Sequence, residues 1–153
     1  MAEMTTSKPK RASSKISAGI LAYRKRAGGF EVLLVHPGGP FWRNKDEGAW
    51  SIPKGEIDID EDPERAARRE FAEELGPDAL IGALRPLGEI RQRGGKRVIA
   101  FSGKSDFEPT SLVSNSFEIE WPPRSGRRQV FPEVDRAEWF ALDAAKAKIL
   151  PPR

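Results

Sequence analysis

Residues 55–77 of the chain read GEIDIDEDPERAARREFAEELGP. Asp62 is a typical helix N-cap, and Pro63 is a typical first helical residue because its fixed φ suits that position. Gly76 is typical of the position just after a helix. The pattern therefore predicts a helix over residues 63–75.

Three glutamates lie along one flank of this predicted helix. Apolar residues four positions apart are expected to form its buried stripe: Ala67, Phe71 and Leu75. At 100° per residue, the side chains beside that stripe are those of Glu70, Glu73 and Glu74. Like charges at these spacings each cost about 0.2–0.5 kcal/mol, and carboxylates in the last turns also oppose the helix dipole. Stability does not explain the arrangement, so we expect a positively charged partner.

The nature of the partner follows from the ligand types in the chain. There is no cysteine and only one histidine, so the clustered ligands are oxygen atoms. Oxygen ligands favour a hard cation, Mg²⁺ or Mn²⁺, over zinc. Magnesium in turn indicates phosphate chemistry.

The spacing of the fixed residues resembles the Nudix box of the Nudix hydrolases. It runs Gly55, five residues, Glu61, seven residues, Arg69-Glu70-Phe71, one residue, Glu73-Glu74, one residue, Gly76. All seven glycine and polar positions match, and a chance match has a frequency below roughly one in ten million per start site. Pro77 departs from the family, which usually has an aliphatic residue there.

The resemblance implies an α/β fold, the Nudix α/β/α sandwich with a mixed β-sheet and a loop-helix-loop catalytic box. It also implies Mg²⁺-dependent (or Mn²⁺-dependent) hydrolysis of a phosphoanhydride bond in a nucleoside diphosphate linked to another group. The residues expected to hold the metal, through one backbone carbonyl and three carboxylates, are Gly55, Glu70, Glu73 and Glu74. Lys54 is expected to contact a substrate phosphate, and Glu61 is expected to pair with Arg69 in a structural role.

Nudix enzymes often use one further glutamate outside the box as a metal ligand or general base. Glu138 is the first candidate for this catalytic role, followed by Glu133 and Glu120. Each of them alone also fits an ordinary surface carboxylate. A base must lie about 2.6–3.2 Å from the attacking water, which a sequence does not show.

The substrate is only partly constrained. The positions about 15–18 residues past the box hold Gln92 and Arg93-Gly94-Gly95, so neither the proline of many ADP-ribose enzymes nor the tyrosine of many diadenosine polyphosphate enzymes is present. Residues 50–56, WSIPKGE, resemble polyphosphate-cleaving members, which favours nucleoside triphosphates and dinucleoside polyphosphates. The alternative is a Nudix-fold module that senses a nucleotide without cutting it. The intact carboxylates of the box argue against that alternative.

Two loops supply further candidates for substrate binding. Residues 41–49 carry two aromatic residues, Phe41 and Trp42, which fit local packing or a stacking surface for a base equally well. Residues 122–128, PPRSGRR, form a basic loop in which Arg124 is the candidate phosphate contact, with plain solvation as the alternative. His36, at the end of an apolar strand, is expected to have a structural or merely surface role and not a catalytic one.

The remaining elements follow from apolar alternation and turn residues. We expect strands at about 17–25, 30–36, 86–92, 97–104, 117–121 and 131–140, and a last short helix at about 142–150.

Length and charge limit the organisation. A chain of 153 residues with 38% hydrophobic residues fits one domain over residues 16–153. Residues 1–15 have the composition of a disordered basic tail, whose four basic residues and one acidic residue account for the whole net charge of +3. The neutral remainder predicts no nucleic-acid partner, with a tether role for the tail as a weaker alternative, and the resemblance implies a small-molecule nucleotide partner. With no secretory or membrane-spanning pattern, the expected location is cytoplasmic, and the resemblance makes a homodimer a further expectation.

Overall fold

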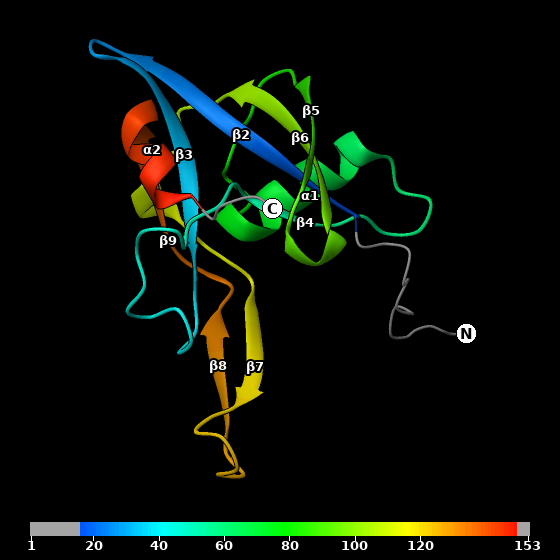
Figure 1. Cartoon of the computed structure of the whole chain (residues 1–153), viewed down its shortest axis with the longest axis vertical. Coiled ribbons are helices and arrows are strands. Elements are labelled where there is room, and N and C mark those ends of the chain that lie inside the picture. The colour runs from blue at the N-terminus through cyan, green and yellow to red at the C-terminus, as the bar shows by residue number, and fades with distance from the viewer. Residues whose placement is uncertain (1–15, 150–153) are drawn as a thin grey trace.

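The structure is a computed structural model, and it describes residues 16–149. Its centre is a sheet with strand order β5-β6-β2-β3-β9, in which β4 pairs with β2 (Figure 1). The strands of this sheet are β2 (Ile16–Arg26), β3 (Gly29–Pro37), β4 (Lys54–Glu56), β5 (Arg85–Arg91), β6 (Arg97–Lys104) and β9 (Val134–Ala141). The pair β2–β6 is parallel and the other pairs are antiparallel. The mixed sheet of the predicted fold class is confirmed.

Helix α1 (Pro63–Leu75) has the bounds that the sequence predicts. The Asp62 side chain accepts a hydrogen bond from the Arg65 backbone amide at 3.0 Å, which caps one of the free amides of the first turn. At the other end Gly76 has a φ of 116°, a value that favours glycine.

Each face of the sheet carries its own core, because successive strand residues point to opposite sides. On one side Leu33 and Val35 of β3 pack with the buried stripe of α1. On the other side Val32 and Leu34 pack with Trp50 and with helix α2 (Leu142–Lys148). The two helices therefore cover opposite faces, as expected for an α/β/α sandwich. No helix within residues 16–149 is long and apolar enough to cross a membrane.

Two short 3₁₀ turns connect the elements: η2 (Arg93–Gly95) and η3 (Pro109–Ser111). One segment departs from the sequence-based expectation of a single last strand at 131–140. It divides into β8 (Arg128–Pro132) and β9, and β8 pairs with β7 (Ser116–Glu120) in a separate two-stranded sheet. Figure 1 shows this hairpin extending from the main sheet as an arm. The predicted tail, residues 1–15, and residue 150 of the predicted last helix lie outside the described residues.

The single histidine is fully buried at the end of β3, consistent with a structural role. Its Nδ1 lies 2.8 Å from an Asp135 carboxylate oxygen, and its Nε2 lies 2.7 Å from the Lys45 carbonyl oxygen. His36 therefore links the loop at Lys45 to β9.

Candidate active site

The C-terminal half of α1 lies against β4. A Cβ atom added at Gly55 would lie 2.0–2.4 Å from the carboxyl atoms of Glu70. The carboxylate of Glu70 therefore occupies the space that a side chain at position 55 would need. This close approach gives a physical reason for the glycine that begins the box.

Glu74 lies next to this contact. Its carboxylate accepts a hydrogen bond from the Lys54 backbone amide, yet burial, with a further contribution from the charge of Glu70, raises its pKa to about 8. Burial also raises the pKa of Glu70, against the opposing hydrogen bond from Arg69. Two neighbouring carboxylates are thus held where negative charge is unfavourable.

Arg69 connects the helix to the loop before it. Its Nε and Nη2 donate to the two carboxylate oxygens of Glu61 at 2.8 and 2.9 Å. The Asp58 backbone amide donates to the same carboxylate at 2.9 Å. These bonds, that from Arg69 foremost, lower the pKa of Glu61 to about 2. The contact between Arg69 and Glu61 that the resemblance implied is present, and it fastens the loop over α1.

The same guanidinium reaches two of the expected metal ligands. Arg69 Nη1 donates to Glu70 at 2.8 Å and lies 3.4 Å from both carboxylate oxygens of Glu73. Among residues 16–149, no three His, Asp or Glu side chains converge as a preformed metal site. The four predicted ligands are therefore close together without a common coordination point.

The chemistry of these groups nevertheless fits a hard cation. The donors are all oxygens, and Glu70 and Glu74 both have raised pKa values. A divalent cation would supply the positive charge that would lower both pKa values. Of the four predicted ligands, those that best fit a cation site are Glu70, Glu74 and the neighbouring Gly55. Glu73 lies instead beside the Arg69 guanidinium.

The structure changes the order of preference among the three candidate glutamates outside the box. Glu133, at the junction of β8 and β9, is close enough to Glu73 that their repulsion contributes, after burial, to the raised pKa of Glu133. Glu138 lies opposite Leu34 in the β3–β9 pair, on the face that packs against α2, while its neighbour Trp139 faces the α1 side. The alternation of side chains along β9 therefore directs Glu138 away from the box. Glu120 accepts a hydrogen bond from the Gly126 amide in the arm.

Lys54 separates the carboxylates from an apolar cavity of about 320 Å³. Burial, with help from the charge of Lys96, lowers the pKa of Lys54, while Glu74 and Glu70 oppose that shift. The cavity lies on the sheet face opposite α1, and its lining includes Leu21, Ile52, Leu87, Ile90, Gln92 and Val98. No pattern in the sequence predicted this cavity. The feature that could have indicated the cavity is a pair of apolar residues on the predicted strand at 86–92, Leu87 and Ile90, both of which are exposed.

The two loop candidates do not join the box. Trp42 is partly buried and packs against the core on the α2 side, which favours packing over stacking. Arg124 lies in the connection at the exposed end of the β7–β8 arm, with a φ of 62° (Figure 1). The arm extends away from the main sheet (Figure 1), and the contact of Arg124 with a substrate phosphate stays a prediction.

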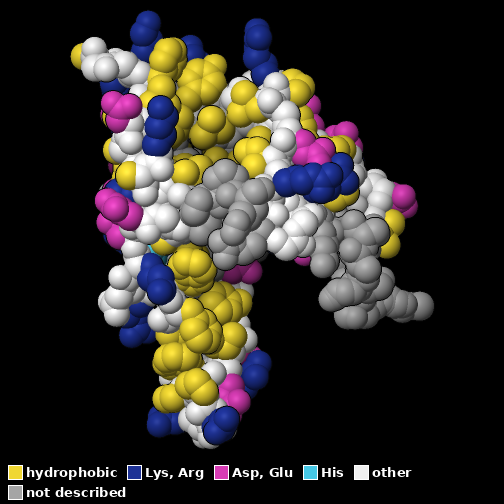
Figure 2. All heavy atoms as spheres, in the orientation of Figure 1, with side chains coloured by type: hydrophobic (Ala, Val, Ile, Leu, Met, Phe, Trp, Pro, Cys, Tyr) yellow, Lys and Arg dark blue, Asp and Glu magenta, His cyan; other side chains and the backbone are white. Residues whose placement is uncertain are grey.

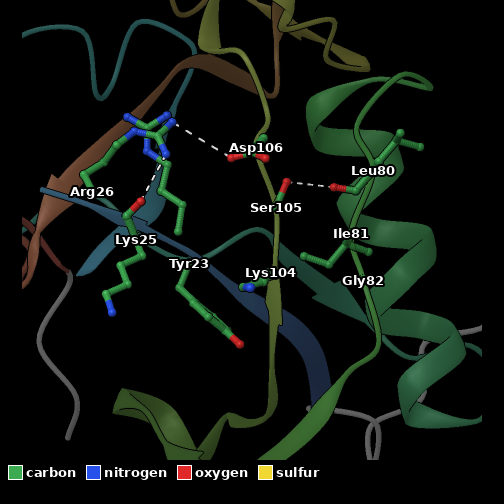
Figure 3. A pocket seen from close by; sticks show the side chains of 10 residues that line it. Tyr23, Lys25, Arg26, Leu80, Ile81, Gly82, Lys104, Ser105 and Asp106 are labelled. Carbon is green, nitrogen blue, oxygen red and sulfur yellow. Dashed lines mark hydrogen bonds and ion pairs between the residues drawn. The ribbon is translucent and has the colours of Figure 1, made fainter. Parts of the chain in front are cut away.

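A larger cavity, of about 620 Å³, lies at the other end of β2 (Figure 3). Its lining includes Tyr23, Arg26 and Lys104, but no residue of the box. The Ser105 hydroxyl in its wall donates to the Leu80 carbonyl at 2.7 Å and accepts from the Phe107 amide at 3.1 Å. Because its hydrogen-bonding capacity is used within the protein, this hydroxyl is not a free nucleophile.

Comparison with curated proteins gives two types of relative. An RNA pyrophosphohydrolase of Gluconacetobacter diazotrophicus is 52% identical over 50 residues, which cover 32% of this chain and 28% of that protein. An 8-oxo-(d)GTP phosphatase of Mycolicibacterium smegmatis is 34% identical over 102 residues, which cover 63% of this chain and 24% of that protein. The chain spans from about a quarter to a half of the length of the curated relatives it matches.

Solved structures and a family model extend the comparison. A C. elegans Ap4A hydrolase binary complex has 26% identity and a TM-score of 0.52, over 86% of this chain and 84% of that one. A MutT/nudix family protein from Enterococcus faecalis has 18% identity and a TM-score of 0.57, over 88% and 46% of the two chains, a likeness of fold alone. The model of the NUDIX domain matches residues 14–153. The chain therefore belongs to the Nudix family, as its box predicted.

Proposed function

We propose that this chain is a divalent-cation-dependent Nudix hydrolase that cuts a phosphoanhydride bond in a nucleoside diphosphate linked to another group. The observation that carries the proposal is the placement of Glu70 and Glu74 against Gly55 and the Lys54 amide, with both pKa values raised. An acidic pair held at this cost indicates a cationic ligand.

The residues around the pair have separable roles. A bound Mg²⁺ or Mn²⁺ would neutralise diphosphate oxygens and lower the pKa of a water molecule. Arg69 orients Glu70 through the 2.8 Å bond and is itself held by Glu61. Lys54 provides a cation for a substrate phosphate. Glu133 replaces Glu138 as the first candidate outside the box for accepting a proton from water.

The cavity beside Lys54 supports a substrate with a nucleoside next to its phosphates. Its walls are mostly aliphatic and suit the faces of a base or the ribose. The Gln92 side-chain amide, which makes no hydrogen bond to any of residues 16–149, is suited to an edge of the base. Nucleoside triphosphates and dinucleoside polyphosphates remain our first substrates. The names of the Ap4A hydrolase and the 8-oxo-(d)GTP phosphatase above support them.

A second candidate is a nucleotide-sensing module that does not cut its ligand. The observation that favours it is the position of Arg69, which hydrogen-bonds Glu70 and Glu73 where a catalytic metal would need their oxygens.

One experiment separates the two. The chain is assayed with Mg²⁺ on nucleoside triphosphates, dinucleoside polyphosphates, ADP-ribose and nucleotide sugars, and the products are separated by ion exchange. We expect turnover that Glu70→Gln and Glu74→Gln each reduce about 100-fold or more, while the matched Glu138→Gln variant keeps wild-type rates. Nucleotide binding without turnover on any compound would contradict the hydrolase and support the sensor.

A further inference from the structure

The β7–β8 arm begins at the candidate site. The Asn115 amide, just before β7, donates to the Glu73 carbonyl at 3.1 Å. The Glu133 amide, just after β8, donates to the Asn115 carbonyl at 2.8 Å. The root of the arm thus holds the last turn of α1 and carries Glu133. With five residues in each strand, the arm reaches about 17 Å from that root.

Aromatic side chains cover one face of the arm. Phe117 and Phe131 are cross-strand partners with ring centroids 6.0 Å apart. Phe41, from the loop after β3, lies edge-on to Trp121 at 5.3 Å. Figure 2 shows hydrophobic side chains gathered along the arm and basic side chains near its end. We call the surface of Phe41, Phe117, Trp121 and Phe131 the aromatic face.

Stability of the arm does not account for all of this surface. A two-stranded hairpin is marginal by itself, so the contact of Phe117 with Gly39 has a structural purpose. Phe41, however, is 63% exposed. Trp121 is partly exposed, and its indole N–H makes no hydrogen bond to a described residue. The Phe41 ring and the Trp121 indole N–H can therefore make contacts that the described residues do not supply.

The charges at the end of the arm are also unbalanced. The Glu120 carboxylate accepts a hydrogen bond from the Gly126 amide at 2.7 Å, and the Glu118 carboxylate lies 3.6 Å from Arg128 Nε. Within the described part of the chain, Arg124 and Arg127 have no carboxylate partner. The aromatic face therefore ends in two cations that are free to meet phosphates.

We propose that the aromatic face binds consecutive bases of a single-stranded RNA whose 5′ phosphates lie at Glu70 and Glu74. This inference rests on the proposed function and specifies the group attached to the diphosphate. Aromatic rings along a groove or arm, together with arginines, are the usual means of binding single strands, since every base has a face that can stack. The net neutrality of residues 16–153 does not oppose such binding, because stacking requires no excess of positive charge.

The dimensions of the arm favour a strand over smaller ligands. An arm of about 17 Å exceeds one nucleoside, so a dinucleoside polyphosphate would contact only part of it. A second copy of the chain would cover the aromatic rings, but it would leave the cations at the end unexplained. The RNA pyrophosphohydrolases among the relatives are consistent with this choice.

The test compares substrates that differ only in length. Hydrolysis of a nucleoside triphosphate and of 5′-triphosphorylated oligoribonucleotides of two and eight residues is measured for the full chain with Mg²⁺. The variants are Phe41→Ala, Phe41→Trp, Arg127→Gln and, as the matched control on the opposite face of the same arm, Val130→Ala, whose side chain is 64% exposed. Circular dichroism and the unfolding midpoint verify that each variant is folded.

We expect the octamer to have a lower KM than the dimer in the wild type. Phe41→Ala is expected to raise the octamer KM about tenfold with little change in kcat or in the kinetics of the nucleoside triphosphate. Phe41→Trp should restore the KM, Arg127→Gln should raise it, and Val130→Ala should not change it. A KM independent of length, or equal effects of Phe41→Ala and Val130→Ala, would overturn the proposal.

Two further measurements separate this inference from the proposed hydrolase. Fluorescence anisotropy with a labelled 5′-hydroxyl octaribonucleotide measures binding to the arm without any reaction. Binding that Phe41→Ala weakens would support the aromatic face even if no compound were hydrolysed. Sedimentation that shows Phe41→Ala dissociating a dimer while RNA affinity is unchanged would assign the face to a second copy and refute the RNA proposal.

Discussion

Glu61→Gln tests the contact that holds the loop of the box over α1. The Glu61 carboxylate accepts hydrogen bonds from Arg69 Nε, Arg69 Nη2 and the Asp58 amide at 2.8, 2.9 and 2.9 Å. The substitution keeps the size of the side chain but removes its charge. One amide oxygen then remains to accept bonds that two carboxylate oxygens now share.

The magnitude follows from the pKa of Glu61, which the Arg69 contact lowers from 4.5 to about 2. A shift of this size corresponds to about 3 kcal/mol. Because water on the open side of the loop screens the pair, we expect Glu61→Gln to lower the free energy of unfolding by about 1–2 kcal/mol. For a chain of this length the unfolding midpoint should fall by about 3–6 °C.

The stabilisation by the Glu61 carboxylate depends on pH in a definite direction. The folded-state pKa of Glu61 lies below its unfolded value, so the stabilisation is complete above pH 4.5 and is lost as the pH falls toward 2. Urea unfolding in EDTA at pH 7 and pH 3 measures it, with Glu64→Gln as the control. Glu64 has only an exposed contact with Arg68 at 3.4 Å, which is expected to contribute less than about 0.5 kcal/mol. A Glu61→Gln effect that equals the Glu64→Gln effect, or that does not shrink at pH 3, would refute this account.

Two further predictions concern the carboxylates themselves. Gly55→Ala would place a Cβ atom 2.0 Å from the Glu70 carboxyl carbon, so we expect weaker Mn²⁺ binding and slower hydrolysis; Gly28→Ala, with no atom within 4 Å, should change neither. In EDTA, the raised pKa of Glu74 should lower the stability of the wild type as the pH increases from 4.5 through about 8. Glu74→Gln should remove that loss. Urea unfolding should therefore find the variant more stable than the wild type at pH 9, with a much smaller difference between the two at pH 4. Equal pH profiles of variant and wild type would contradict the assignment.

Local features of the sequence were sufficient to predict α1. The Asp62 cap directly precedes the helix, Pro63 and the apolar stripe lie within its 13 residues, and the structure has the predicted bounds. The Arg69 contact with Glu61 was implied by the resemblance of this one short segment to the Nudix box. Such features depend on helix geometry, which is the same in every fold.

Features that depend on pairing between distant segments were less predictable. Glu133 and Glu138 both lie within the predicted last strand at 131–140, and only the register of β9 against β3 shows that Glu138 is directed away from the box. The alternation at 117–121 predicted a strand correctly, but its partner β8 was not recognised, because Arg128 was assigned to a loop and residues 131–132 to the last strand. Trp42 was equally compatible with stacking and packing until the core beneath it was visible.

Hydrolysis by this chain should depend on a divalent cation that Glu70 and Glu74 bind. Electron paramagnetic resonance of Mn²⁺ titrated into the chain measures that binding, with the variants Glu70→Gln and Glu74→Gln and the control Glu138→Gln. We expect Mn²⁺ to bind the wild type and Glu138→Gln with similar affinity, and to bind each box variant at least about tenfold more weakly. Wild-type Mn²⁺ affinity in both box variants would contradict that expectation.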